Sequence, residues 1–229
     1  MNLKHLGIIF DWDGVVLDSS SFHEESWNIL AARRSLSLPE GHFHRGFGMR
    51  NETIIPEVLE WTQVPEEISE LAQEKELIYR ELLKQKGIEP LPGVQALLSE
   101  LKSLSIRTAV GSSTPRENLD LAMSLLQLED FFEVTVCGND VKRGKPFPDV
   151  FQTAADRLGC EYHHCVVIED APVGIEAAHR AGMQCVAIPT TNSIQVIQNA
   201  DLIIPSLEDI VADQLAQLIL NPGHKAGLK

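Results

Sequence analysis

The sequence has few basic residues: 19 lysines and arginines stand against 33 aspartates and glutamates, giving a formal net charge of −14. Proteins that bind nucleic acid rely on clustered lysine and arginine to neutralise phosphates. The charge balance therefore argues against a nucleic-acid partner and favours a monodisperse protein, which we expect to be a monomer. An anionic substrate would need a local cation, from a metal ion or from a few placed basic side chains.

Long hydrophobic runs are also lacking. No apolar stretch approaches the roughly 18 residues that a membrane span requires, and acidic residues follow the N-terminus too early for a signal peptide. We therefore expect no membrane partner and a cytoplasmic location. The composition, with 44% hydrophobic and 23% charged residues, is ordinary for a folded globular chain.

Cysteine is scarce as well, with only four residues in the chain: Cys137, Cys160, Cys165 and Cys185. Their spacing contains no C-x-x-C pair and no histidine pattern typical of a zinc site. Three of them lie in or beside apolar runs, where cysteine packs as a small hydrophobic residue. We expect buried thiols rather than a zinc site.

Short apolar runs rich in valine and isoleucine recur along most of the chain. They cover residues 6–10, 106–112, 132–138, 164–170, 184–188 and 201–204. Segments with apolar residues at helical spacing follow them, at 93–104, 115–128, 148–159, 174–183 and 207–220. This alternation predicts an α/β fold, with a Rossmann-like parallel sheet covered by helices on both faces.

Residues 20–87 interrupt the alternation, because they contain no convincing strand. Helical patterns cover 22–35, 51–61 and 65–87, whereas the segment HFHR at 42–45 places its two histidines on alternate sides and is expected to be a loop rather than a metal site. The prolines within 88–93 are typical of a linker. The sequence thus predicts an inserted all-α cap domain over 19–88 and a core formed by 1–18 and 89–229.

Polar side chains follow the predicted strands where ligands bind in open α/β sheets, beyond the carboxyl ends. In chain order they are Asp11 and Asp13, Ser112 and Ser113, Asp140 and Lys145, and Glu169 and Asp170. Crowded carboxylates raise one another's pKa unless a cation neutralises them. An oxygen-rich set suited to Mg²⁺ consists of Asp11, Asp13, Glu169 and Asp170.

This set of residues suits phosphoryl chemistry. An aspartate beside a metal ion can attack phosphorus and carry a covalent phosphoaspartate. Asp13 lies two residues from Asp11 across a turn that Gly14 permits, where it can protonate a leaving alkoxide. Lys145 and Ser112 would stabilise the transferring phosphoryl group.

Structural roles compete with some of these assignments. Asp18 fits a helix cap or the hinge into the helical insert, and Asp170 precedes a helical segment that it could cap. Ser113 and Thr114 stand before Pro115 and also fit N-caps. A calcium loop beginning at Asp11 is excluded, because its twelfth position is Phe22 where a bidentate glutamate is required.

Four segments, in order and spacing, resemble the motifs of the haloacid dehalogenase-like hydrolase superfamily over about residues 6 to 190. They are DWDGVVLDS, Ser112 after an apolar strand, Lys145 within GKPFPDVF, and IEDAPVGIEAAHRAG. The resemblance implies that Asp11 is the nucleophile and that Asp13 is the general acid and base, with its main-chain carbonyl on Mg²⁺. It also implies phosphate binding by Ser112 and Lys145, with Ser113 as a neighbouring candidate, and metal binding by Asp170 with Glu169 close by.

The helical insert resembles the small α-helical cap of this superfamily, which closes over the site and excludes water. Within it, His23, Arg50 and Lys75 match positions at which the β-phosphoglucomutase branch contacts substrate, although the spacing at Arg50 is one residue shorter. His23 also fits a helix start and Lys75 a solvated helix position. Pro115 replaces a substrate-binding lysine of the mutase, within a pattern more typical of phosphatases.

Asp13 favours phosphate-ester chemistry, because haloacid dehalogenases lack an acid at that position. We therefore predict a Mg²⁺-dependent phosphatase that acts on a small phosphorylated metabolite through a phosphoaspartate. The alternative is an isomerase of the β-phosphoglucomutase type, which returns the phosphoryl group to a second sugar hydroxyl. A third possibility is a non-catalytic member that senses phosphate.

Overall fold

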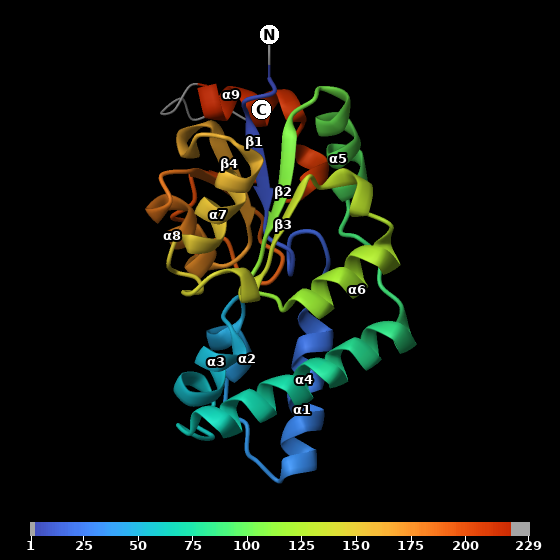
Figure 1. The fold of residues 1–229 in the computed structure, drawn as a ribbon, viewed down its shortest axis with the longest axis vertical. Helices are drawn as coiled ribbons and strands as arrows, with labels where there is room; N and C mark the ends of the chain where they lie inside the picture. Colours follow the sequence, from blue (N-terminus) through green and yellow to red (C-terminus); the bar gives the residue numbers. More distant parts are fainter. Residues whose placement is uncertain (1–2, 221–229) are drawn as a thin grey trace.

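A six-stranded, wholly parallel sheet forms the centre of the computed structural model, which describes residues 3–220 (Figure 1). Its order is β3-β2-β1-β4-β5-β6. The strands are β1 (Gly7–Phe10), β2 (Arg107–Gly111), β3 (Val134–Val136), β4 (Cys165–Glu169), β5 (Gln184–Ala187) and β6 (Leu202–Ile203). Every strand lies within a segment that the sequence predicts to be extended, and the α/β fold class is confirmed.

Helices cover both faces of the sheet. On one face α5 (Val94–Ser103), α6 (Arg116–Leu126) and α9 (Ala212–Leu220) share a hydrophobic cluster with Ile8 and Phe10 of β1. On the other face α7 (Asp149–Leu158) and α8 (Pro172–Arg180) pack on Ile9. Successive strand residues point to opposite faces, so burial of both faces explains why these runs are continuously hydrophobic.

Short 3₁₀ helices complete this part of the chain: η2 (Glu129–Phe131), η3 (Gly138–Asp140), η4 (Tyr162–His164) and η5 (Leu207–Asp209). The single helix expected over 207–220 is wrong in detail, because the backbone is extended at Ile210 and separates η5 from α9. The four cysteines are buried and free, as expected. Within 3–220, no helix combines the length and the apolar character needed to cross a membrane.

The helical insert consists of α1 (Ser20–Arg34), α2 (His42–Gly46), α3 (Asn51–Thr53), the π-helical turn η1 (Ile54–Val58) and α4 (Pro65–Lys86). It lies beyond the carboxyl ends of the strands (Figure 1). Its own hydrophobic cluster includes Trp27, Leu30, Ile55 and Ile78. Trp27 therefore has a core role in the insert.

Two local expectations for the insert are corrected. Residues 42–45 form most of the short helix α2 rather than a loop. The helix expected over 51–61 changes to π geometry at η1, where the Leu59 amide donates to the Ile54 carbonyl at 2.9 Å. Pro56 lies within this turn and has no backbone N–H, so regular α-helical hydrogen bonding is interrupted there.

Packing of the insert can be tested at Leu30, which is fully buried in its cluster. We expect Leu30→Ala to lower the free energy of unfolding by about 2–5 kcal/mol, because the cavity it leaves cannot close completely. Leu77 on α4 is 55% exposed, and Leu77→Ala should change stability by less than about 0.5 kcal/mol. Urea denaturation measures both, and equal losses would contradict this packing.

Candidate active site

The loop after β1 carries two acidic side chains into the space beyond the sheet. The Asp11 amide donates to the Ile168 carbonyl at 2.9 Å, which extends the pairing of β1 with β4. The chain then turns at Gly14, whose φ of 81° is left-handed. A side chain at Gly14 would also overlap the carboxylate of Asp170. Glycine at this position therefore lets the β1 loop turn and lie against the end of β4.

A buried lysine links the ends of three strands. Lys145, in the loop after β3, places its Nζ 2.8 Å from Asp11 Oδ2 and 2.6 Å from Glu169 Oε1. Burial of Lys145 disfavours its charged form, but the attraction of Asp11 and Glu169 outweighs burial and raises its pKa above the ordinary value. The ammonium thus stays charged and holds the side chains of Asp11 and Glu169 together.

Glu169 has donors on both of its carboxylate oxygens. Oε1 accepts from Lys145, while Oε2 accepts from the backbone amides of Asp170 and Ala171, each at 2.8 Å. Its carboxylate packs so tightly against Gly174 of α8 that a side chain there would overlap it. Glu169 therefore fixes both the lysine and the turn from β4 to α8, and Asp170 is not the N-cap of α8, because Ala171 takes that position.

The carboxylates at these strand ends fit a hard divalent cation. Single oxygens of Asp11, Glu169 and Asp170 lie within 4.8 Å of one another. Oδ1 of Asp11 and Oδ1 of Asp170 are buried and have no hydrogen-bond partner. Burial and the charge of Glu169 raise the pKa of Asp170 well above its ordinary value. Two unpartnered buried oxygens among crowded carboxylates are what a Mg²⁺ ion would satisfy.

The hydroxyl groups of Thr190 and Thr191, after β5, also belong to the site and are not among the residues predicted for it. Thr191 Oγ1 donates to Asp170 Oδ2, and Thr190 Oγ1 lies 3.3 Å from the same oxygen. Thr190 also donates to the Gly14 carbonyl at 2.5 Å. The strand-end rule would have found both threonines, because they follow the strand predicted at 184–188.

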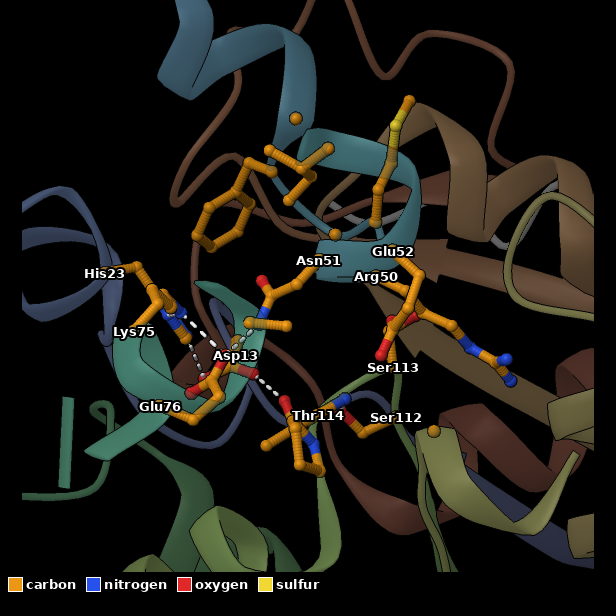
Figure 2. Close-up of a pocket in the computed structure, with 18 of the residues that line it drawn as sticks. Asp13, His23, Arg50, Asn51, Glu52, Lys75, Glu76, Ser112, Ser113 and Thr114 are labelled. Atoms are coloured by element: carbon orange, nitrogen blue, oxygen red, sulfur yellow. Dashed lines mark hydrogen bonds and ion pairs between the residues drawn. The ribbon is translucent and has the colours of Figure 1, made fainter. Parts of the chain in front are cut away.

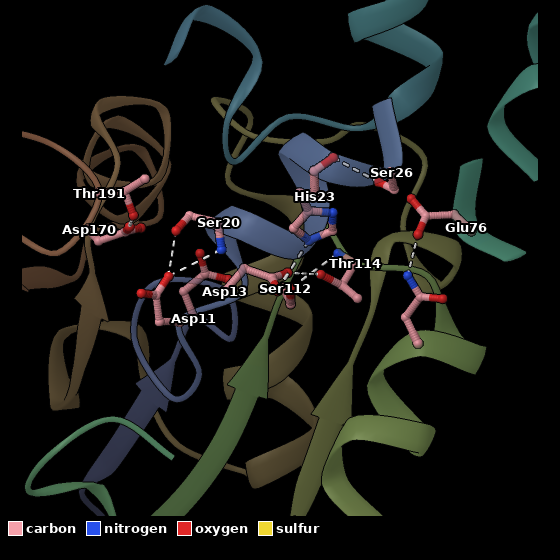
Figure 3. Close-up of polar contacts among 12 residues, drawn as sticks. Asp11, Asp13, Ser20, His23, Ser26, Glu76, Ser112, Thr114, Asp170 and Thr191 are labelled. Atoms are coloured by element: carbon pink, nitrogen blue, oxygen red, sulfur yellow. Dashed lines mark hydrogen bonds and ion pairs between the residues drawn. The ribbon is translucent and has the colours of Figure 1, made fainter. Parts of the chain in front are cut away.

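Asp13 faces the insert (Figure 3). Its Oδ2 accepts from Thr114 Oγ1, and its Oδ1 lies 3.4 Å from His23 Nε2. Burial opposes ionisation of Asp13, but His23 and the hydroxyls of Ser19 and Thr114 hold its pKa below the ordinary value. Thr114 is thus a site residue that sequence analysis assigned to helix capping.

The insert supplies a histidine and a lysine next to Asp13. Lys75 Nζ lies 2.6 Å from His23 Nδ1, and the His23 ring stacks on Tyr79 with centroids 4.2 Å apart. Lys75 is 2% exposed, so the alternative of a solvated helix lysine is wrong. The structure therefore brings two of the three substrate-binding candidates in the insert beside the acidic loop.

Two serines follow β2. Ser112 Oγ is buried and accepts from the Thr114 amide at 3.1 Å, and Ser113 Oγ is buried without a partner. Neither Ser113 nor Thr114 caps α6, because Pro115 is its N-cap residue. Asp18 lies away from these groups on the surface, where its Oδ1 accepts from the Ser20 amide and hydroxyl at the start of α1. This placement agrees with a structural role for Asp18.

Arg50 is directed elsewhere. Its Nη2 donates to the Val141 carbonyl at 2.9 Å and its Nη1 to the Lys142 carbonyl at 3.4 Å. The guanidinium packs on Gly144, where a side chain would collide with it. Figure 2 shows it pointing away from Asp13 and Ser112. Arg50 therefore joins the insert to the loop that carries Lys145.

A cavity of about 750 Å³ lies between the insert and the strand ends, and both Asp11 and Asp13 line it. Its lysine and arginine side chains are Arg50, Lys75 and Arg80. Each has a partner within the protein: main-chain carbonyls for Arg50, His23 and Glu76 for Lys75, and Asn118 Oδ1 for Arg80. Among the described residues lining this cavity, no lysine or arginine is left unpaired.

Comparisons with known proteins agree with this arrangement. The family model for haloacid dehalogenase-like hydrolases matches residues 8–188. The chain is 35% identical over 221 residues to the chloroplastic 5-amino-6-(5-phospho-D-ribitylamino)uracil phosphatase of Arabidopsis thaliana, covering 95% of this chain and 59% of that protein. It thus spans less than two thirds of that relative. A fructose-1-phosphate phosphatase of Escherichia coli is 32% identical over 187 residues, covering 81% of this chain and 97% of the relative.

Among solved structures, β-phosphoglucomutase from Clostridium difficile superposes with a TM-score of 0.83 at 25% identity. The match covers 93% of this chain and 96% of that structure. The likeness therefore extends over the sheet and the helical insert together.

The carboxylate crowding predicts a pH dependence for the metal-free protein. Burial raises the pKa of Asp11 from 3.8 to about 8, with Lys145 opposing the rise and Glu169 adding to it. The folded state thus favours neutral Asp11, and this contribution to the free energy of unfolding is complete below pH 3.8 and lost as the pH rises through about 8. When a chelator removes metal ions, the melting temperature of the protein should fall as the pH rises from 3.8 through about 8.

The matched variant is Asp11→Asn, which is neutral at every pH and nearly isosteric. It should show a smaller fall in melting temperature over the same range, and added Mg²⁺ should raise the melting temperature of the unmodified protein most at high pH. Parallel pH profiles for the two proteins in chelator would show that Asp11 does not carry the effect.

Proposed function

Because the chain belongs to the haloacid dehalogenase-like hydrolases, we propose that it is a Mg²⁺-dependent phosphatase that hydrolyses a phosphomonoester of a small metabolite. The observation that carries the proposal is the pair Asp11 and Asp13 at the end of β1. Lys145 contacts Asp11 from the core, and His23 contacts Asp13 from the insert. The two aspartates thus have different environments and suit different roles.

Asp11 is the nucleophile in this proposal. One carboxylate oxygen forms a bond to phosphorus while the bond from phosphorus to the ester oxygen breaks, leaving a phosphoaspartate. The Lys145 ammonium orients the carboxylate and stabilises charge on the phosphoryl oxygens. Ser112 and Ser113, which line the cavity beside Asp13, donate hydroxyl hydrogen bonds to those oxygens. Ser113 Oγ is suited to this because it has no partner within the protein.

Asp13 is the proton donor and acceptor. A bound phosphate dianion raises the pKa of a neighbouring carboxyl, which offsets the lowering by His23 and favours protonated Asp13 when substrate is present. Asp13 then gives its proton to the leaving alkoxide. As a carboxylate it next takes a proton from the water that attacks the phosphoaspartate, so the enzyme returns to its starting state.

Asp11, Asp170 and the main-chain carbonyl of Asp13 would hold the Mg²⁺ ion, which when bound neutralises the carboxylates and the phosphoryl oxygens. The unpartnered oxygens of Asp11 and Asp170 support this assignment. Glu169 remains a predicted ligand, but its oxygens already accept from Lys145 and two amides. We therefore assign Glu169 first to holding Lys145.

Residues 19–88 form a cap domain in this proposal, and the core comprises 1–18 and 89–229, of which 1–2 and 221–229 lie outside the described residues. The separate hydrophobic cluster of the insert supports the division. A cap over the strand ends excludes bulk water during phosphoryl transfer and supplies the contacts that select a substrate. A cytoplasmic location and a monomeric state stay predictions.

Hydrolysis is favoured over phosphoglucomutase activity by the basic groups of the cavity. A mutase handles a bisphosphate, whose second phosphate needs its own cationic site. Here Arg50 is engaged by the Val141 and Lys142 carbonyls, and Pro115 stands where the mutase has a lysine. The mutase remains the second candidate because His23 and Lys75 are in place and the C. difficile enzyme has the same fold. The complete acid pair disfavours a non-catalytic role.

Asp11→Asn tests the mechanism. We expect it to reduce Mg²⁺-dependent release of phosphate from p-nitrophenyl phosphate by more than about 1,000-fold, because the amide is a poor nucleophile. Asp18→Asn is the matched control, since Asp18 is an exposed acid seven positions later; we expect its rate to stay within about twofold. Undiminished phosphate release from a folded Asp11→Asn protein would rule out the phosphoaspartate.

The products separate the two candidate reactions. With Mg²⁺ and β-glucose 1-phosphate, or with fructose 1-phosphate, we expect inorganic phosphate and free sugar, because every lysine and arginine that the structure describes along the cavity is already paired within the protein. Phosphate is measured colorimetrically and sugar phosphates by chromatography. Accumulation of glucose 6-phosphate without phosphate would instead establish the mutase.

A further inference from the structure

Glu76 is a buried acid in the cavity wall that the proposed reaction does not use. It lies on α4 next to Lys75 and is 6% exposed. Its Oε1 accepts from Lys75 Nζ at 2.9 Å and from Asn51 Nδ2 at 2.6 Å. Burial opposes ionisation of Glu76, but Lys75, His23 and the amide donors hold its pKa below the ordinary value. Glu76 is therefore a carboxylate that supplies the counter-charge for a buried lysine.

The other oxygen of Glu76 reaches the core. Oε2 accepts from Nδ2 of Asn118, which lies on α6 and is 1% exposed. Arg80 Nη1 donates to Oδ1 of the same amide at 2.6 Å. Glu76 and Arg80 are four residues apart on α4 and thus share one face of the helix. Because a carboxylate only accepts and a guanidinium only donates, the Asn118 amide has a single orientation that satisfies both.

On its other side, Glu76 is linked to the acidic loop through Lys75 and His23. The Lys75 ammonium has only donors, so His23 Nδ1 at 2.6 Å must accept. With Nδ1 accepting, the proton on the other ring nitrogen, Nε2, faces Asp13 Oδ1 at 3.4 Å. Through Lys75 and His23, the charge of Glu76 thus influences the Nε2–H group that faces Asp13, although Glu76 does not contact Asp13.

These contacts form one path from α6 of the core, through α4 and α1 of the insert, back to the β1 loop of the core. We propose that Glu76 is a positioning residue. Its contact with Asn118 holds the insert against the core, and its contact with Lys75 orients the His23 ring toward Asp13. The inference rests on the proposed phosphatase function. It means that loss of the Glu76 contacts should impair proton transfer at Asp13, although Glu76 touches neither Asp13 nor the reacting atoms.

The test separates positioning of a proton donor from a general structural role. Kinetics are measured for Glu76→Gln with p-nitrophenyl phosphate and with the sugar phosphate that the unmodified enzyme hydrolyses fastest. An alkyl leaving group needs a proton, whereas p-nitrophenolate leaves readily without one. We expect kcat/KM to fall about 10- to 100-fold for the sugar phosphate and less than about threefold for p-nitrophenyl phosphate. Equal losses on both substrates would overturn the proposal.

Docking of the insert on the core is tested at Asn118, the residue of α6 that contacts Glu76. Asn118→Asp places a second carboxylate opposite Glu76, and we expect faster amide hydrogen exchange in α6 and α4 together with a loss of kcat/KM. The double variant Glu76→Gln/Asn118→Asp exchanges acid and amide across the contact and should return hydrogen exchange toward that of the unmodified protein. Failure of this recovery would overturn the role of the contact in docking.

Glu81→Gln is the control for the change of charge, because Glu81 is exposed on the same helix. Its kinetics should match those of the unmodified enzyme. If the unmodified enzyme hydrolyses phosphate esters and Glu76→Gln is equally active, the inference is wrong and the proposed function stands. If the unmodified enzyme hydrolyses none, the proposed function is wrong, and hydrogen exchange alone decides whether the Glu76 contact controls docking.

Discussion

The rest of the site depends on one buried cation, the ammonium of Lys145 between Asp11 and Glu169. Three buried carboxylates at neighbouring strand ends would repel one another, and a single positive charge from the loop after β3 offsets part of that repulsion. The oxygens of Asp11 and Asp170 that still have no partner would hold a second, divalent cation in the proposed function. In the proposed function, the remaining repulsion among the carboxylates is offset by the bound metal ion.

The sheet makes this cluster possible because parallel strands end at one edge. β1 delivers Asp11, the loop after β3 delivers Lys145, and β4 delivers both Glu169 and Asp170. Hydrophobic burial on both faces of the sheet keeps those ends fixed. The close approach of these carboxylates to the neighbouring backbone also requires glycine at two positions. Gly14 leaves room for Asp170, and Gly174 leaves room for Glu169. Packing and electrostatics are thus satisfied by the same few residues.

The insert contributes in a different way, through polar contacts that cross to the core. Arg50 contacts carbonyls beside the lysine loop, and Glu76 accepts from Asn118 on α6. Arg50 is engaged by these carbonyls and Lys75 by the carboxylate of Glu76, which in the proposed function favours hydrolysis over return of the phosphoryl group to the sugar.

The sequence by itself determined the α/β fold, the strands and the candidate residues Asp11, Asp13, Lys145 and Asp170, because strand periodicity and strand-end chemistry are local patterns. It could not place Thr114 or Glu76 in the site, since their partners Asp13 and Asn118 lie 101 and 42 positions away. Nor could it show that Arg50 contacts main-chain carbonyls. Those assignments depend on which distant segments meet in space, and only the tertiary structure decided that.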